Sequence, residues 1–457
     1  MIPVLIAAAA ALGITYAARR LWALSSAVRL RGFERMNRGP LVMVPGESVG
    51  ADCFKTLYRH PATRRRRQGA ALSNLHFYWL WPSAGIHQEN LEDGPGYDRV
   101  AAATRRLLAV PPARAHRTAA RLTTEALERL DARRPTALRV RDLMTPVWAE
   151  FFYELVFREP CPAATRALIV ANSDNVLGTI KHITPLDLRV RRRLVAVLSE
   201  RLATGRPVPA LPDALTTRQQ ALYLQGVFFG TGVAQMSEAV AHLCMNLATR
   251  PSLQHKITAD ADGRLLDAAI QESLRLFPLF GIAHRVTTAD IEIPGLSIPR
   301  GTVLCFDYTA YQRQGFERPH DFLAERWLHQ DPRTANHAPF GVTGNRPCPA
   351  RGIAPGLIGA AVREILRCHT LDTAARHTRP LHNRGPCILT PRPATAAAAP
   401  SSRDGTGLLR LRMRVRDQAD EMYYRIAQIV IGTRTVRRAE RAGLCDRTFE
   451  DRERTST

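Results

Sequence analysis

The stretch Pro339–Gly352, which reads PFGVTGNRPCPARG, combines residue types that can hold a metal and an anion. Cys348 stands between two prolines, which lack a backbone N–H and restrict the chain on either side. The glycines permit a tight backbone path before it. A thiolate held in this way is a natural axial ligand for iron, and Arg346 is placed to bind an anionic group. The alternative interpretation is a surface loop with a buried, inert cysteine.

Length and charge limit the classes of protein that fit. A chain of 457 residues can form one large domain or two unequal ones. The formal net charge of +23 rests mainly on arginine and indicates an acidic partner, a membrane surface or nucleic acid. We expect no nucleic acid, since neither zinc-finger spacing nor an aromatic RNA-binding signature accompanies the charge. The cysteines are scattered without CxxC pairs, which favours a reducing compartment.

The chain begins with an apolar run, Ile2–Ala18, that Arg19 and Arg20 close. Its length is at the lower limit for a membrane-spanning helix. Because the positive charges follow the run, they favour an anchor at residues 1–20 that leaves the remaining chain on the cytoplasmic side. The alternative is a buried or amphipathic first helix.

Apolar residues recur at helical spacing through the first two-thirds of the chain, and short strand patterns follow. The fold class that we predict is therefore mainly α with small β-sheets. The predicted helices are Tyr97–Ala109, Arg114–Ala132, Val140–Phe157, Pro185–Leu202, Thr217–Thr249 and Leu265–Phe277. The predicted strands are Ile282–Val286, Ile291–Ile293 and Thr302–Phe306.

The longest predicted helix, Thr217–Thr249, is apolar almost all round, so we expect it to run through the interior. Gly226, Gly230 and Gly232 interrupt it, each at a cost of roughly 1 kcal/mol relative to alanine. Two explanations stay open. Either a ligand or another backbone approaches closely, or the glycines serve ordinary helix packing.

Three motifs occur in a fixed order after this helix: QESLRLFP, HRVTTADIEIPGLSIPRGTVL and FERPHDFLAERW. Together with the cysteine stretch, they make the chain from about Thr217 to Thr390 resemble the cytochrome P450 family. The resemblance implies a cytochrome P450-like catalytic domain at residues 21–392 with heme b as cofactor. In the first motif, Glu272 and Arg275 lie three residues apart, where they can pair, and the third motif supplies Arg326.

The resemblance also implies roles for individual residues. Cys348 would be the proximal ligand of the heme iron. Glu272, Arg275 and Arg326 would form a structural network that braces the cysteine loop. The remaining residues implied at the cofactor are Arg346 and Arg285 for the propionates, Arg105 for the same task, and Phe340, Gly344 and Gly232.

The sequence departs from the family pattern on both sides of the expected heme. Phe340 precedes Cys348 by eight residues where the family usually has seven, and Pro355 falls where the next helix should continue. In the central helix, Ala234 and Gln235 occupy the positions of the family's acid–alcohol pair, close to Thr231. Neither side chain can shuttle a proton as a carboxylic acid does, although glutamine can still form hydrogen bonds. A slipped alignment would place Thr231, Ser237 or Glu238 there instead.

The leading functional hypothesis is a heme-thiolate enzyme that modifies a hydrophobic small molecule, in natural-product biosynthesis, by atypical chemistry on a preactivated substrate. Cyclisation, rearrangement and group transfer such as nitrene transfer belong to this class. One alternative is conventional monooxygenation, such as hydroxylation or epoxidation, that depends on dioxygen and on a ferredoxin or flavoprotein reductase. Another alternative is a non-catalytic heme sensor or binding protein.

Residues 393–457 read as a linker and a basic C-terminal extension. The linker is ATAAAAPSSRDGTG, and Leu408–Arg416 then alternates apolar residues with arginine. This period of two suits an edge strand or a basic interfacial segment, and Met422–Ile431 suits one helix face. We expect a poorly ordered appendage, and the alternative is a tail that helps to seat the protein on a membrane or a partner.

Overall fold

The computed structural model describes residues 20, 24, 27, 28, 31, 41–63, 86, 91, 93–208, 210–392 and 406–441. The apolar run Ile2–Ala18, on which the predicted anchor rests, lies outside these residues. Among those that are described, no helix is both long enough and apolar enough to cross a membrane.

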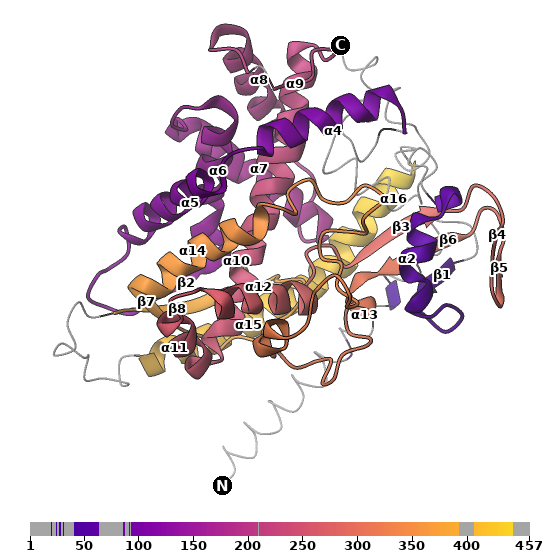
Figure 1. The fold of residues 1–457 in the computed structure, drawn as a ribbon. Helices are drawn as coiled ribbons and strands as arrows, with labels where there is room; N and C mark the ends of the chain where they lie inside the picture. The colour runs from indigo at the N-terminus through magenta and orange to yellow at the C-terminus, as the bar shows by residue number, and fades with distance from the viewer. Residues whose placement is uncertain are drawn as a thin grey trace.

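Four helices pack together at the centre of the molecule: α5 (Pro112–Leu127), α6 (Val140–Phe157), α10 (Val233–Ala248) and α14 (Ala354–Cys368). Their apolar side chains form most of the largest buried cluster. Figure 1 shows α10 crossing behind α14 in this core. The other helices and turns are α2 (Asp52–Arg59), η1 (Pro61–Thr63), α4 (Pro95–Leu108), α7 (Ala163–Ile180), α8 (Leu188–Thr204), α9 (Thr217–Leu224), α11 (Pro251–Ala259), α12 (Arg264–Leu276), α13 (Tyr308–Tyr311) and η3 (Ala324–Leu328).

The structure contains small sheets, as the sequence predicts, and they lie at the side of the helical core. One contains β1 (Leu41–Val44), β6 (Val303–Asp307) and β3 (Ile282–Val286), with β1 parallel and β3 antiparallel to β6. A second has the order β2 (Thr136–Arg139), β8 (Pro386–Pro391) and β7 (His369–Asp372). The third is the hairpin of β4 (Ile291–Ile293) and β5 (Leu296–Ile298). The strand pairings bring the first and last parts of the domain together.

The helix predicted over Thr217–Thr249 is not uniform. It begins at α9 with a capping box, in which Thr216 and Gln219 each bond the other's backbone N–H. It then widens into a π-helical stretch, η2 (Gln225–Gly232), before α10. All three glycines of the sequence prediction lie in this stretch. A Cβ on Gly232 would lie 3.0 Å from two ring atoms of Phe152 on α6, so helix packing explains that glycine.

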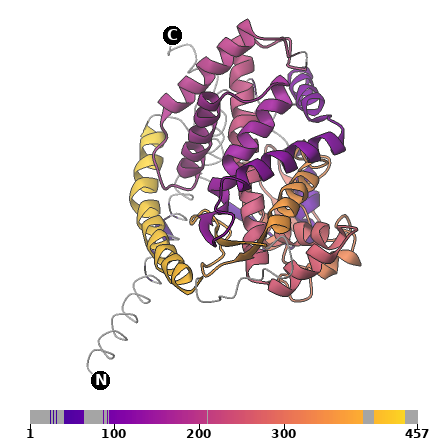
Figure 2. The same ribbon diagram turned by 90° about the vertical axis from the view of Figure 1, so that its left-hand side faces the viewer.

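The C-terminal extension differs from its prediction. Residues 406–441 are helical, as α15 (Thr406–Ala427), the π-helical η6 (Gln428–Gly432) and α16 (Thr433–Arg441). The expected edge strand over Leu408–Arg416 and the expected poorly ordered appendage are therefore wrong for this part. Figure 2 shows the extension as a long yellow helix along one edge of the molecule. It is held there by side chains of the domain, among them Asp372, which binds Arg410.

Candidate active site

The cysteine loop closes on itself immediately before α14. The backbone N–H of Cys348 donates to the carbonyl oxygen of Phe340 at 2.8 Å. This hydrogen bond brings the two ends of the loop, which are eight residues apart, next to each other. Gly341 and Gly344 have φ values of 78° and 96°, which glycine adopts without strain. Cys348 is half-buried and lies six residues before α14, whose first turn contains Pro355. The helix thus starts late enough for this proline to be tolerated.

Two of the predicted anion-binding arginines are buried near the loop. Arg346 is 9% exposed, and its guanidinium lies 4.4 Å from the ring centroid of Tyr97. It binds the Asp93 carboxylate at 2.9 Å and also the carbonyl oxygen of Leu91. Arg285 is 3% exposed and donates to the hydroxyl of Tyr58 at 3.1 Å. Both side chains are therefore held in place by the protein.

The remaining predicted cofactor contacts are less enclosed. Arg105 is exposed on α4. Gly344 is exposed beside the Arg59 side chain, whose Nε donates to the loop carbonyl of Thr343 at 2.7 Å. Phe340 is half-buried and packs against the main core. The structure therefore places Arg285 and Arg346, but not Arg105, in buried surroundings.

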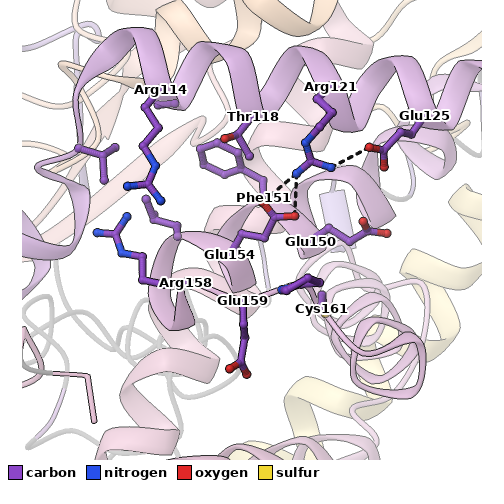
Figure 3. Close-up of a pocket in the computed structure, with 14 residues that line it drawn as sticks. Arg114, Thr118, Arg121, Glu125, Glu150, Phe151, Glu154, Arg158, Glu159 and Cys161 are labelled. Atoms are coloured by element: carbon purple, nitrogen blue, oxygen red, sulfur yellow. Dashed lines mark hydrogen bonds and ion pairs between the residues drawn. The ribbon is translucent and has the colours of Figure 1, made fainter. Parts of the chain in front are cut away.

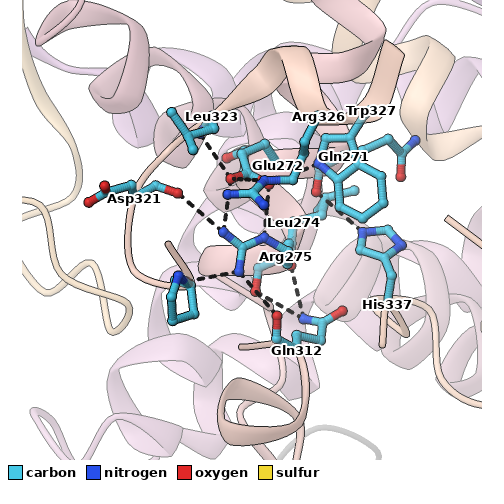
Figure 4. A network of polar contacts seen from close by, with 12 residues as sticks. Gln271, Glu272, Leu274, Arg275, Gln312, Asp321, Leu323, Arg326, Trp327 and His337 are labelled. Atoms are coloured by element: carbon cyan, nitrogen blue, oxygen red, sulfur yellow. Dashed lines mark hydrogen bonds and ion pairs between the residues drawn. The ribbon is translucent and has the colours of Figure 1, made fainter. Parts of the chain in front are cut away.

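Glu272, Arg275 and Arg326 are brought together by α12 and η3, as Figure 4 shows. Both Glu272 oxygens accept from Arg275 at 2.8 Å, and one also accepts from Arg326 at 3.2 Å. Two further donors are the indole of Trp327 at 2.8 Å and the N–H of Leu323 at 2.9 Å. Arg275 uses its other hydrogens on the carbonyl oxygens of Gln312, Pro319 and Asp321.

The surroundings of Glu272 decide its charge. Burial alone would raise the pKa of this carboxyl, but the hydrogen bonds from Arg275 and from the Leu323 backbone, with the nearby positive charges, lower it. The pKa of Glu272 therefore lies below its ordinary value, and the carboxylate stays ionised. A fully buried charge of this kind is stable only when such donors surround it.

The central helix presents one partly exposed side in an otherwise buried stretch. Val227, Thr231 and Gln235 follow one another at intervals of four residues and are half-exposed, whereas Ala234 is only 3% exposed. The Thr231 hydroxyl oxygen is itself buried and has no hydrogen-bond partner among the described residues. A buried hydroxyl usually has a partner, so this oxygen indicates a place where a ligand can bind.

Of the three groups that a slipped alignment would supply, Ser237 and Glu238 already have partners, whereas Thr231 does not have one among the described residues. The Ser237 hydroxyl donates to the carbonyl oxygen of Val233 at 2.6 Å. Glu238, the single acid in α10, is 7% exposed and forms ion pairs with Lys181 and, at 3.3 Å, with Arg141. Burial, together with neighbouring Arg141, lowers the pKa of Lys181 to about 8, although Glu238 opposes the shift. Neither Ser237 nor Glu238 is therefore free to carry protons to a ligand.

A separate cavity of about 400 Å³ lies between α5 and α6 (Figure 3). Its carboxylates have arginine partners: Arg121 binds both Glu125 and Glu154, Arg166 binds Glu150, and Arg201 binds Glu159. None of the residues that line it belongs to the cysteine loop or to the segment 230–235. This cavity is therefore distinct from the candidate active site.

The sequence analysis did not predict several residues that bind the predicted site residues and the cysteine loop. Tyr58 on α2 accepts from Arg285 through its hydroxyl and from Asn345 through its carbonyl oxygen, so it links β3 to the cysteine loop. Asp93 is the observed partner of Arg346. Only Trp327 had a signal in the sequence, since it directly follows Arg326 in the third motif.

These features fit the heme that the resemblance implies. Cys348 offers a half-buried thiol, and α14, which follows it, packs against α10. Arg285 and Arg346 are buried cations that can bind propionates. On η2, the Thr231 oxygen lacks a partner among the described residues, and the adjoining side of the central helix is only partly covered by protein.

Comparison with known proteins gives the same assignment. Residues 213–396 match the family Cytochrome P450. Cytochrome P450 3A12 of Canis lupus familiaris is 31% identical over 143 residues, which are 27% of this chain and 28% of that protein. Cytochrome P450 27C1 of Danio rerio is 31% identical over 153 residues, or 29% of this chain and 28% of that protein. The chain thus matches less than a third of the length of these curated relatives.

Solved structures extend the likeness of fold to most of the chain. Ligand-free cytochrome P450 OleT has a TM-score of 0.64 at 15% identity, and the match covers 77% of this chain and 89% of OleT. CYP175A1 from Thermus thermophillus has a TM-score of 0.59 at 19% identity, with coverages of 78% and 87%. The residues that match the family include the Glu272 network, the strands after it and the cysteine loop. The chain therefore resembles cytochromes P450 in sequence over residues 213–396 and in fold over most of its length.

Proposed function

We propose that the protein is a heme-thiolate enzyme that modifies a hydrophobic small molecule by atypical chemistry on a preactivated substrate. Cys348 would ligate the iron, with Arg285 and Arg346 on the propionates. Bound heme would supply redox-active iron at the reacting atoms of the substrate. Cyclisation, rearrangement or group transfer such as nitrene transfer, in natural-product biosynthesis, are the reactions that this proposal covers.

The observation that carries the proposal is the lack of an available acid in the central helix. Ala234 and Gln235 replace the acid–alcohol pair, and Glu238 is engaged by Lys181 and by buried Arg141. Activation of dioxygen needs protons, which a positioned acid usually delivers. A substrate that arrives already activated removes that requirement. The Gln235 amide and the Thr231 hydroxyl would then orient the substrate through hydrogen bonds.

The test compares a preactivated substrate with its parent compound. A fatty-acid hydroperoxide and the parent fatty acid are suitable probes, since a neighbour of similar fold, a variant of OleT, was solved in complex with arachidonic acid. We expect the holoenzyme to convert the hydroperoxide without dioxygen or reductant and to leave the parent acid unchanged. Conversion of the parent acid that depends strictly on dioxygen and a reductase would instead establish conventional monooxygenation.

A matched variant sharpens this comparison. Ala234→Asp combined with Gln235→Thr restores the acid–alcohol pair, and Ala234→Asn with the same threonine restores its shape without the acid. We expect only the first to gain dioxygen-dependent turnover. A heme site that excludes every lipophilic compound, seen as no spin-state shift across a metabolite screen, would favour the non-catalytic sensor.

We also propose that residues 1–20 anchor the protein in a membrane with the catalytic domain on the cytoplasmic side. The apolar run Ile2–Ala18 and the arginines after it support this orientation. The check is fractionation of the full-length protein at low salt without detergent. Recovery entirely in the soluble fraction would contradict the anchor.

A further inference from the structure

The C-terminal helix docks on the domain through one side. Along α15 and η6, Met413, Tyr424, Ala427 and Gln428 are buried. The acids of this helix are also used on the domain side, where Asp420 binds Arg139 at 2.5 Å and Glu421 binds His382 at 2.7 Å. Asp417 accepts from the Asn383 amide at 2.7 Å. On the inward side of the helix, the apolar side chains are therefore buried and the acidic side chains have partners in the domain.

The opposite side carries large apolar residues in contact with solvent. The described residues include eleven exposed large hydrophobics, and seven of them lie on α15 and η6. These seven are Leu408, Leu411, Val415, Met422, Tyr423, Ile426 and Val430, with exposures between 39% and 61%. Apart from the adjacent Met422 and Tyr423, they follow one another at intervals of three, four or seven residues, which places them on one broad face of a helix. An exposed apolar stripe of this length on a protein surface marks an interaction site.

Arginines accompany the stripe, whereas acids do not. Arg412, Arg414 and Arg416 are exposed among the first apolar residues, and Arg434, Arg437, Arg438 and Arg441 are exposed on α16. Among the described side chains of residues 406–441, none of the acids is exposed. We call Leu408–Arg441, on its solvent side, the outward face. Its large exposed side chains are mainly apolar or positively charged, and no acid among these described side chains is exposed.

We propose that the outward face of α15–α16 binds the surface of an anionic lipid membrane. Apolar side chains would enter the boundary between headgroups and acyl chains, and the arginines would contact lipid phosphates, as in interfacial amphipathic helices. A second copy of this chain fits poorly, because it would bring the same positive charges together. This proposal depends only on the composition of the outward face. It does not depend on the proposed reaction or on the proposed N-terminal anchor.

The experiment places a fluorescent reporter on the outward face of the full-length holoenzyme. Tyr423→Trp is mixed with phosphatidylglycerol vesicles whose acyl chains carry bromine, and the spectrum of the unchanged protein is subtracted. We expect bromine to quench the introduced tryptophan, because an interfacial side chain lies about 5–10 Å deep. Phe280→Trp, at a residue that is 47% exposed outside the extension, serves as the matched control and should not be quenched.

Charge is tested with a second variant. Arg412→Gln together with Arg416→Gln, added to Tyr423→Trp, should lower the quenching in anionic vesicles and leave it unchanged in phosphatidylcholine vesicles. Vesicle-bound protein without quenching at position 423 would overturn the proposal, and so would equal quenching in the Phe280→Trp control. Emission that shifts with protein concentration in the absence of lipid would show self-association instead and would also overturn it.

Discussion

The carboxylate of Glu272 and the guanidinium of Arg275 form two parallel hydrogen bonds of 2.8 Å, and neither side chain is exposed to solvent. This pair joins α12 to the segment that leads toward the cysteine loop, because Glu272 also binds the N–H of Leu323 and Arg275 binds three backbone carbonyls. Figure 4 shows how these contacts converge. The network therefore has a mechanical role that can be tested apart from catalysis.

Glu272→Gln is expected to destabilise the protein strongly. The amide leaves buried Arg275 without an anion and turns one acceptor into a donor that faces other donors. We expect a loss of about 3–5 kcal/mol in the free energy of unfolding. Denaturant unfolding of the holoprotein measures it. Glu125→Gln removes an exposed ion pair to Arg121 and should cost less than about 1 kcal/mol. Equal effects of the two changes would contradict the bracing role.

Cys348→Ala should abolish the thiolate signature in the spectrum of the reduced, carbon-monoxide-bound protein. The fold should persist, since the contact that closes the loop uses the backbone N–H of residue 348 and not its sulfur. Circular dichroism checks that point. Cys368→Ala provides the control, because this thiol is half-buried at the far end of α14. An unchanged spectrum for Cys348→Ala would refute the ligand assignment.

Thr231→Val should stabilise the ligand-free protein or leave it unchanged. The hydroxyl is buried without a partner among the described residues, and valine keeps its shape without a polar atom. Relief of an unsatisfied group contributes about 1 kcal/mol. If the hydroxyl binds substrate, the same variant should weaken the spin-state shift that substrate produces. A loss of stability comparable to that of a core hydrogen bond would show that Thr231 is already satisfied in the protein.

Acid should loosen the C-terminal helix through Glu421. The hydrogen bond from His382, and to a lesser extent its charge and Arg425, lowers the pKa of Glu421 to about 2 although burial opposes the shift. A depressed carboxyl pKa contributes stability above the ordinary value near 4.5 that disappears as the pH falls toward 2. The difference in unfolding free energy between the parent protein and Glu421→Gln should therefore shrink between about pH 6 and about pH 2.5. A constant difference would exclude this linkage.

Three predicted elements agree with the structure to the residue. Val140–Phe157 and the strands Ile282–Val286 and Ile291–Ile293 have the predicted bounds. The extension was predicted wrongly because LLRLRMRVR is short. Over so few residues, the same apolar positions fit the period of two of a strand and also one face of a helix. In the structure this stretch is part of a helix that continues to Ala427. Helix α7 was missed because its apolar residues do not keep to one face.

The candidate site was predictable only in part, and for a similar reason. Glu272 and Arg275 share one helix, so their spacing already indicates a pair. Tyr58 and Asp93 reach the cysteine loop from the other end of the domain, and no local pattern specifies such contacts. The π-helical stretch Gln225–Gly232 was also beyond prediction, since its backbone hydrogen-bond register depends on packing against neighbouring helices.

The parallel pairing of β1 with β6 has a consequence for how the chain is made. Leu41–Val44 pairs with Val303–Phe306. The β1 strand can therefore pair with β6 only after most of the domain has been synthesised. Until then, the strand presents unpaired backbone groups and apolar side chains, a state that favours aggregation. Contacts between such distant segments also slow folding. Expression yield should therefore respond to the rate of translation and to chaperones that shield this early strand.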